Sequence, residues 1–225
     1  MIIAIDGPAG SGKSTIGKLV AEELDYLYFD TGIMYRAVTY AAIRDGIDIQ
    51  DERSITQLAR VANIDLRTPT IADGRDSDVL LEEQDVTWEI RSPEVDANVS
   101  IVAAYPEVRK ALGEKQRQIG LNGKVVMVGR DIGTVILPEA DLKIYLDASL
   151  GERANRRYKE LKNRGEDVKY DAILSMLRER DRIDSTRDFA PLKPADDAIV
   201  IDSDKLNIQE VFTRIFEIIN QRRAN

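Results

Sequence analysis

The stretch GPAGSGKST at residues 7–15 constrains this chain more than any other feature of its sequence. It fits the pattern G-x-x-x-x-G-K-[ST], and it lies between the apolar run MIIAID and the helical pattern of KSTIGKLVAEELD. In such a loop the glycines let successive backbone N–H groups point into one cavity at the start of a helix. The stretch therefore predicts a phosphate-binding loop for a nucleoside triphosphate. Lys13 would contact the β- and γ-phosphates and the Ser14 hydroxyl would bind Mg²⁺.

This loop identifies the phosphoryl donor but not the reaction, because switches, motors and small-molecule kinases all use it. A GTPase switch would need the motifs D-x-x-G and N-K-x-D, and neither occurs in the chain. The residues assigned to ATP are Gly7, Pro8, Ala9, Gly10, Ser11, Gly12, Lys13, Ser14 and Thr15.

The later apolar runs indicate the fold class. YLYFD, KVVMVG, LKIYLDA and AIVID each predict a short buried strand, and helical patterns alternate with them. Together with MIIAID they predict an α/β fold with a parallel sheet of about five strands. Residues 63–90 break this rhythm with strand-like pieces and no clear helix, so we expect an antiparallel excursion there. We expect one domain over residues 1–225.

Composition excludes several kinds of chemistry. The chain has no cysteine and no histidine, which excludes thiol nucleophiles, disulfides, Cys/His metal sites and imidazole catalysis. Its net charge of −8 argues against binding of nucleic acid or anionic membranes over the whole surface. No apolar run approaches the ~18 residues of a membrane span, and no basic leader precedes MIIAID, so we expect a cytoplasmic protein.

Arginines nevertheless gather at the predicted ends of strands and on the elements beside them, and ligands of parallel sheets bind at that edge. These arginines are Arg36, Arg130, Arg153, Arg157 and Arg180. Plainer interpretations exist for these stretches. Asp30 or Thr31 could cap a helix, and Arg36 could belong to a solvated face. Arg153 and Arg157 could belong to a salt-bridged surface helix, and nearby acids could neutralise Arg180. Their sum is more positive charge than one triphosphate requires, which indicates a second phosphate.

Seven stretches of the sequence resemble bacterial cytidylate kinases, a family of nucleoside monophosphate kinases. They are GPAGSGKST, DTGIMYRA, VSIVAAYPEVR, GRDIGTV, ERANRRYKEL, RERDRIDSTR and APLKPADDAIVID. The resemblance implies a P-loop kinase fold with a five-stranded parallel core, an antiparallel monophosphate-binding insertion at about 62–100 and a short helical lid at about 152–165. It also implies a monomeric enzyme that uses Mg²⁺ and passes the γ-phosphoryl group of ATP to CMP or dCMP.

The resemblance also implies roles for single residues. It places Thr31, Arg36 and Arg130 on the CMP phosphate, and Ser100, Arg109 and Asp131 near the cytosine edge. It places Arg180, Asp184 and Arg187 along the ribose, phosphate and base side of CMP. Arg153 and Arg157 would close from the lid, and the catalytic residues would be Lys13, Arg130, Arg153 and Arg157.

One position departs from the family pattern. The family usually has an aspartate before GRD, where this chain has Val128. The resemblance implies that Ser14 and the phosphates hold Mg²⁺ without that carboxylate. Two other functions stay open from the sequence: a kinase for UMP or AMP, and a nucleotide-binding regulator or nucleic-acid-binding ATPase that uses the arginine-rich region.

Overall fold

The structure is a computed structural model, and it describes residues 1–224. Its internal contacts divide the chain into two compact units. The first contains residues 1–30 and the chain from Arg117 onward, and the second contains residues 31–116. Within the described residues, no helix combines the length and the apolar character needed to cross a membrane.

A parallel sheet of five strands forms the centre of the first unit, in the order β2-β6-β1-β7-β8. The strands are β1 (Ile2–Asp6), β2 (Leu27–Asp30), β6 (Val125–Gly129), β7 (Leu142–Asp147) and β8 (Ile199–Asp202). All five of the apolar runs in the sequence form these strands, so the predicted α/β class is confirmed. Central strands read as continuous apolar runs because helices cover both faces of such a sheet. Every residue of β6 is buried.

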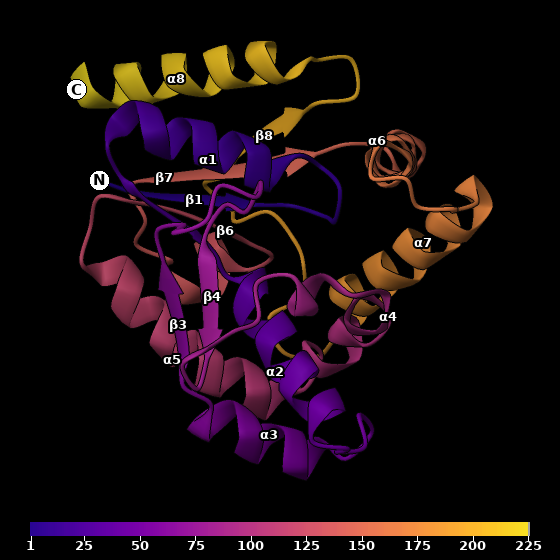
Figure 1. Ribbon diagram of the computed structural model, residues 1–225. Helices are drawn as coiled ribbons and strands as arrows, with labels where there is room; N and C mark the ends of the chain where they lie inside the picture. The colour runs from indigo at the N-terminus through magenta and orange to yellow at the C-terminus, as the bar shows by residue number, and fades with distance from the viewer. Residues whose placement is uncertain (225) are drawn as a thin grey trace. The chain divides into compact units, whose positions relative to one another are not determined.

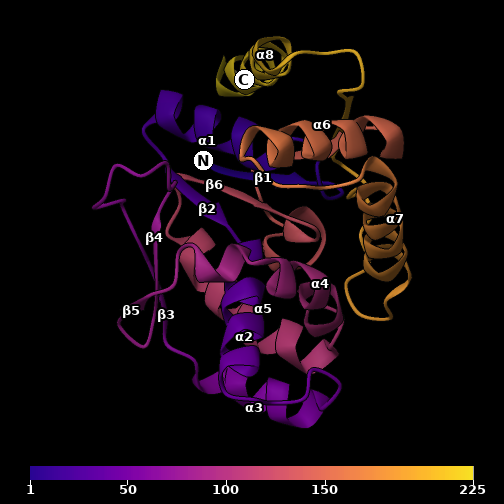
Figure 2. The same ribbon diagram turned by 45° about the vertical axis from the view of Figure 1, so that its right-hand side comes forward.

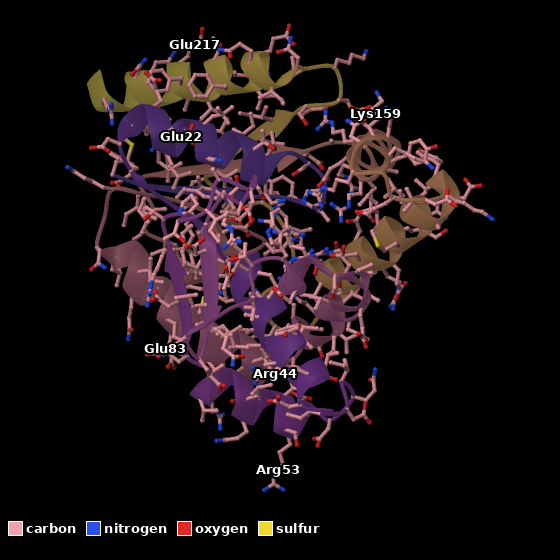
Figure 3. The ribbon with its side chains drawn as sticks, in the orientation of Figure 1. Glu22, Arg44, Arg53, Glu83, Lys159 and Glu217 are labelled. Atoms are coloured by element: carbon pink, nitrogen blue, oxygen red, sulfur yellow. The ribbon has the colours of Figure 1, made fainter. Side chains whose placement is uncertain are left out.

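Among the described residues, four helices and one π-helical turn lie entirely within the first unit. The helices are α1 (Lys13–Leu24), α6 (Leu150–Asn163), α7 (Tyr170–Thr186) and α8 (Ile208–Ala224), and the turn is η2 (Ile132–Ile136). α1 and α8 lie side by side, and they pack their apolar sides into one cluster with the sheet (Figure 1). Glu22 of α1 and Glu217 of α8 are exposed on their outer sides (Figure 3).

The helices α6 and α7 pack against one another in the first unit (Figure 2). Ala154 and Leu161 of α6 form a buried cluster with Ile173 and Leu177 of α7. Both of these α7 residues are buried on the side of the helix that packs against α6. Arg187 itself lies just beyond the helix, at its C-cap.

The second unit contains helices and a small antiparallel sheet. Its helices are α2 (Gly32–Arg44), α3 (Glu52–Val61), the short 3₁₀ helix η1 (Glu89–Arg91) and α4 (Pro93–Val102), and α5 (Pro106–Leu121) begins in this unit and continues into the first. Its strands are β3 (Ile64–Arg67), β4 (Asp78–Leu81) and β5 (Gln84–Asp85), paired antiparallel in that order. The expected antiparallel excursion is therefore confirmed.

One arginine holds the loops of this small sheet together. The Arg75 guanidinium is 5% exposed and forms ion pairs with Asp73 at 2.8 Å, Asp78 at 2.9 Å and Asp85 at 2.5 Å. Three carboxylates around one guanidinium satisfy most of its donors. This ionic centre fixes the segment where short strands alone would bury little apolar surface.

Candidate active site

The phosphate loop follows β1 and ends at α1, as the sequence predicted. Gly7 has φ of 149°, and a Cβ placed there would lie 2.1 Å from the Leu146 carbonyl oxygen. Gly12 caps α1 in the left-handed region, with φ of 98° and no side chain to occupy the helix N-terminus. The first N–H groups of α1 therefore stay available at the loop, which is the arrangement that binds phosphate anions.

Lys13 lies over the loop that precedes it. Its side chain is buried, and its Nζ donates to the Pro8 carbonyl oxygen at 2.7 Å. Burial, followed by the charge of Arg130, holds the pKa of Lys13 well below its usual range, and the charge of Arg180 acts in the same direction. The charges of Asp30 and Asp6 act in the opposite direction and raise this pKa. A polyphosphate bound on the loop would add further negative charge beside Lys13.

Ser14 and Asp30 meet at the start of α1 and the end of β2. The exposed Ser14 hydroxyl donates a hydrogen bond to Asp30 Oδ2 at 2.9 Å. Thr31 is the N-cap of α2, but its side chain makes no capping hydrogen bond. Thr31 therefore does occupy the N-cap position that the plainer interpretation gave it, without a capping bond from its side chain.

Asp184 of α7 lies among three arginines in the first unit. Its Oδ2 accepts from Arg130 Nε at 2.9 Å, and its Oδ1 accepts from Arg187 Nη1 at 3.5 Å. Burial alone would raise the pKa of Asp184, but the charges of Arg130, Arg180 and Arg187 hold it below its usual range. The neutralisation of arginines by nearby acids, which the sequence left open, is therefore part of this arrangement.

The two arginines assigned to the lid on α6 differ in their environment. Arg153 is 5% exposed and contacts Asp181 at 2.7 Å, the Ala9 carbonyl at 3.2 Å and the Ala148 carbonyl at 2.8 Å. Arg157 is partly exposed and pairs with Glu160 at 2.9 Å on its own helix. The alternative of a salt-bridged surface helix therefore fits Arg157 but not Arg153, which connects α6 to the phosphate loop.

In the second unit, Arg36 of α2 donates to the Ile90 carbonyl oxygen at 3.0 Å and to Asp96 Oδ1 at 2.5 Å. Arg109 of α5 is 3% exposed, donates to the Ala103 carbonyl and lies 5.2 Å from the centre of the Tyr35 ring. Ser100 of α4 is also buried. Arg53 on α3, by contrast, extends into solvent (Figure 3).

The predicted residues are divided between the two units. The phosphate loop lies with Arg130, Asp131, Arg153, Arg157, Arg180, Asp184 and Arg187 in the first unit, and Thr31, Arg36, Ser100 and Arg109 lie in the second. In the part of the chain that the structure describes, no three His, Cys, Asp or Glu side chains gather into a metal site.

Two residues at the candidate site, Asp6 and Arg156, escaped the sequence reasoning, and a third, Asp30, was considered only as a helix cap. Asp6 accepts the backbone N–H groups of Ile132 at 2.8 Å and Gly133 at 2.7 Å, directly after Arg130 and Asp131. Arg156 donates to the Ser11 carbonyl at 3.3 Å. Asp30 accepts from Ser14. Asp6 and Asp30 are each the last residue of a predicted strand. That position could have identified both of them from the sequence.

Comparisons with known proteins give the family of this chain. A family model described as cytidylate kinase matches residues 3–221. A cytidylate kinase of Herpetosiphon aurantiacus is 51% identical over 217 residues, which cover 96% of this chain and 93% of that protein. A cytidylate kinase of Chloroflexus aggregans is 53% identical over 208 residues, which cover 92% of this chain and 89% of that protein. A solved structure of an uncharacterized protein from Eubacterium ventriosum has a TM-score of 0.52 and 13% identity over 98% of both chains, a likeness of fold alone. This chain belongs to the cytidylate kinase family.

Proposed function

We propose that this protein transfers the γ-phosphoryl group of ATP to CMP or dCMP, giving ADP and CDP or dCDP. The observation that carries this proposal is the gathering of Lys13, Arg130 and Arg180 at the phosphate loop of a chain whose net charge is −8. That much local positive charge suits two phosphate-bearing substrates that would otherwise repel one another. Membership of the cytidylate kinase family supports cytidine monophosphates as the acceptors.

Each group of residues takes a part in the proposal. The loop residues 7–15 bind the ATP phosphates, and Lys13 with Arg130 contacts the transferring group. Thr31, Arg36 and Arg130 bind the acceptor phosphate. Ser100, Arg109 and Asp131 read the cytosine edge, and Arg180, Asp184 and Arg187 contact the rest of CMP. Residues 152–165 act as a lid that brings Arg153 and Arg157 to the reacting phosphates.

The reaction needs little covalent help from the protein. An oxygen of the CMP phosphate is already an anionic nucleophile, so its attack on the γ-phosphorus needs no general base. The bond from that phosphorus to the β-phosphate oxygen breaks as the new bond forms, and fixed cations stabilise the charge that spreads over the transferring group. Exclusion of water by the lid prevents loss of the phosphoryl group to hydrolysis. The absence of histidine is consistent with this chemistry.

Mg²⁺ is the cofactor of the proposal. The donors at the loop fit it, because the hydroxyl of Ser14 and the carboxylate of Asp30 are hard oxygen groups that meet at 2.9 Å. Bound Mg²⁺ would neutralise charge that develops on the β- and γ-phosphates.

The enzyme would work as a monomer in the cytoplasm, where its nucleotide substrates are found.

A coupled assay of ADP release tests the proposed function. With ATP and Mg²⁺, we expect kcat/KM to be highest for CMP and dCMP, and lower for UMP and AMP by roughly 10²-fold or more. A higher kcat/KM for UMP or AMP than for CMP would mean that the preferred acceptor is not cytidylate. ATP hydrolysis with no transfer to any monophosphate would contradict the kinase assignment.

A further inference from the structure

Asp30 ends β2 beside the first turn of the helix that follows the phosphate loop. Its Oδ2 accepts the hydrogen bond of the Ser14 hydroxyl at 2.9 Å, across 16 residues of sequence. The two side chains come from different elements, β2 and α1, so the contact depends on the fold rather than on a local turn. From this contact we propose that Asp30 is the protein carboxylate that binds and orients Mg²⁺ together with ATP. The inference rests on the proposed function.

The direction of the hydrogen bond prepares the serine for a cation. A hydroxyl has one proton to donate and two lone pairs to share. Because the proton of Ser14 is directed to Asp30, its lone pairs point elsewhere, and a cation can use them. A carboxylate behind a metal-binding group holds that group in orientation and raises its basicity. Ser14 is exposed and Asp30 is partly exposed, so an ion that arrives with ATP can reach both side chains.

The charge of Asp30 also couples the metal to the nucleotide. Its carboxylate lies within hydrogen-bond distance of Ser14 at the start of α1, beside the phosphate loop. A negative charge this close to the loop repels a bare triphosphate and attracts a triphosphate that carries a divalent cation. Asp30 therefore favours the metal-bound form of ATP over free ATP.

The neighbouring strand does not offer a second carboxylate at this point. The partner of Asp30 in the parallel pairing of β2 and β6 is Val128, which is 1% exposed and belongs to the apolar core. The carboxylate beside Ser14 is therefore supplied by β2. At this pairing of β2 with β6, Asp30 carries a negative charge and Val128 carries none.

Binding of ATP in the absence of any acceptor tests the inference without turnover. Calorimetry would give the Kd of ATP with EDTA and with saturating Mg²⁺, for the wild type and for Asp30→Asn. Asparagine keeps a hydrogen-bond acceptor for Ser14 but removes the charge. We expect the tightening of ATP binding by Mg²⁺ to fall about tenfold in Asp30→Asn, because partners behind a metal ligand contribute 10–100-fold to affinity. The affinity for free ATP should stay equal or rise.

The matched control is Asp25→Asn, at the opposite end of α1. Asp25 is exposed and has φ of 54°, a conformation that asparagine adopts easily. This variant loses the same charge and should keep the wild-type response to Mg²⁺. Thermal melting checks that each variant is folded, and Asp30→Ser replaces Asp30→Asn if the latter does not fold.

The outcomes separate this inference from the proposed function. If the wild type phosphorylates CMP and Asp30→Asn retains the full effect of Mg²⁺ on ATP binding, the role of Asp30 is wrong and the function stands. If the wild type binds ATP in an Mg²⁺-dependent way but transfers to no monophosphate, the function fails and Asp30 is still tested. An equal loss of the Mg²⁺ effect on ATP binding in Asp25→Asn would also overturn the inference, because the effect would then depend only on the net charge of the protein.

Discussion

Asp6 shows how burial sets the behaviour of a single residue in this protein. It ends β1 immediately before the phosphate loop, and its carboxylate accepts two backbone N–H groups from η2. Burial raises the pKa of Asp6 to about 6 against the opposing effect of those hydrogen bonds and of Lys13, and the charge of Asp131 adds to the increase. The carboxylate thereby fixes the backbone that follows Arg130 and Asp131. Through this contact Asp6 can position two residues that are proposed to contact the substrate.

The raised pKa of Asp6 predicts a pH effect on stability. Because the folded protein holds this proton more tightly than the unfolded chain, Asp6 adds stability below about pH 4 that is lost as pH rises through about 6. We expect the unfolding free energy of the wild type, relative to Asp6→Asn, to fall by roughly 2–3 kcal/mol between about pH 4 and pH 7. Urea unfolding at several pH values measures this difference. A constant difference between the two proteins would show that Asp6 keeps its ordinary pKa.

Asp131 is the residue proposed to distinguish cytosine from uracil. Cytosine presents an amino donor at N4, whereas uracil presents an acceptor at O4, so a carboxylate favours the former. Each buried mismatch costs on the order of 1–3 kcal/mol. We therefore expect Asp131→Ala to lower kcat/KM more for CMP than for UMP and to narrow the ratio between them by roughly tenfold or more. An equal loss for both acceptors would mean that Asp131 only orients its neighbours.

At the scale of elements, the sequence predicted what local patterns determine and missed what depends on pairing between distant segments. The strands were predictable because a central parallel strand is apolar along its whole length. The phosphate loop was predictable because its glycines and Lys13 are contiguous. The Arg130–Asp184 contact joins residues 54 apart, and the Arg156–Ser203 contact joins residues 47 apart. No pattern within one element indicates which acidic or polar group a given arginine will meet.

The helix α6 carries the two arginines of the proposed lid, and their environments predict different results. Arg157→Ala should lower kcat by at least about tenfold with little change in the KM for CMP or in stability, because its pair with Glu160 is partly exposed. Arg153→Ala should also lower the free energy of unfolding, by about 1–3 kcal/mol, because it removes the partner of Asp181 and two buried carbonyl contacts. Steady-state kinetics and thermal melting of both variants measure these effects. A change in the KM for CMP alone in Arg157→Ala would place the lid elsewhere.

The strand β6 gives a second prediction at this scale, through Val128. A Cβ placed on Gly17 of α1 would lie 2.6 Å from Val128 Cγ1, so the helix and strand are in close contact there. Val128→Asp would bury a carboxylate in that contact and should lower the unfolding free energy by about 2–4 kcal/mol. Mg²⁺ with ATP should restore more stability to Val128→Asp than to the neutral control Val128→Asn. Equal protection of the two variants, measured by thermal melting, would show that a carboxylate at this position does not reach the ion.

At the scale of the whole molecule, negative charge exceeds positive charge, and several of the arginines assigned to the site are buried. The chain has 32 Lys and Arg residues against 40 Asp and Glu residues. Of the arginines assigned to the site, Arg109, Arg153 and Arg187 are 3%, 5% and 8% exposed. Exposed carboxylates such as Glu22 and Glu217 lie on outer helix surfaces (Figure 3). A small anion can reach a buried cation through a narrow opening, whereas a polyanion needs an accessible basic surface.

This distribution of charge predicts that the protein does not bind nucleic acid, which separates the kinase from the alternative of a nucleic-acid-binding ATPase. Proteins that bind polynucleotides without sequence preference have Kd values of roughly 10⁻⁴–10⁻⁶ M near physiological salt, and their affinity rises steeply as salt is lowered. We expect the anisotropy of fluorescent single-stranded RNA or DNA to stay unchanged with this protein between about 150 mM and 50 mM salt. Binding that depends steeply on salt and is abolished by ATP or CMP would contradict this prediction. It would mean that the arginines of the site bind nucleic acid. Binding that neither nucleotide affects would instead identify a separate basic surface, and the net charge of −8 argues against one.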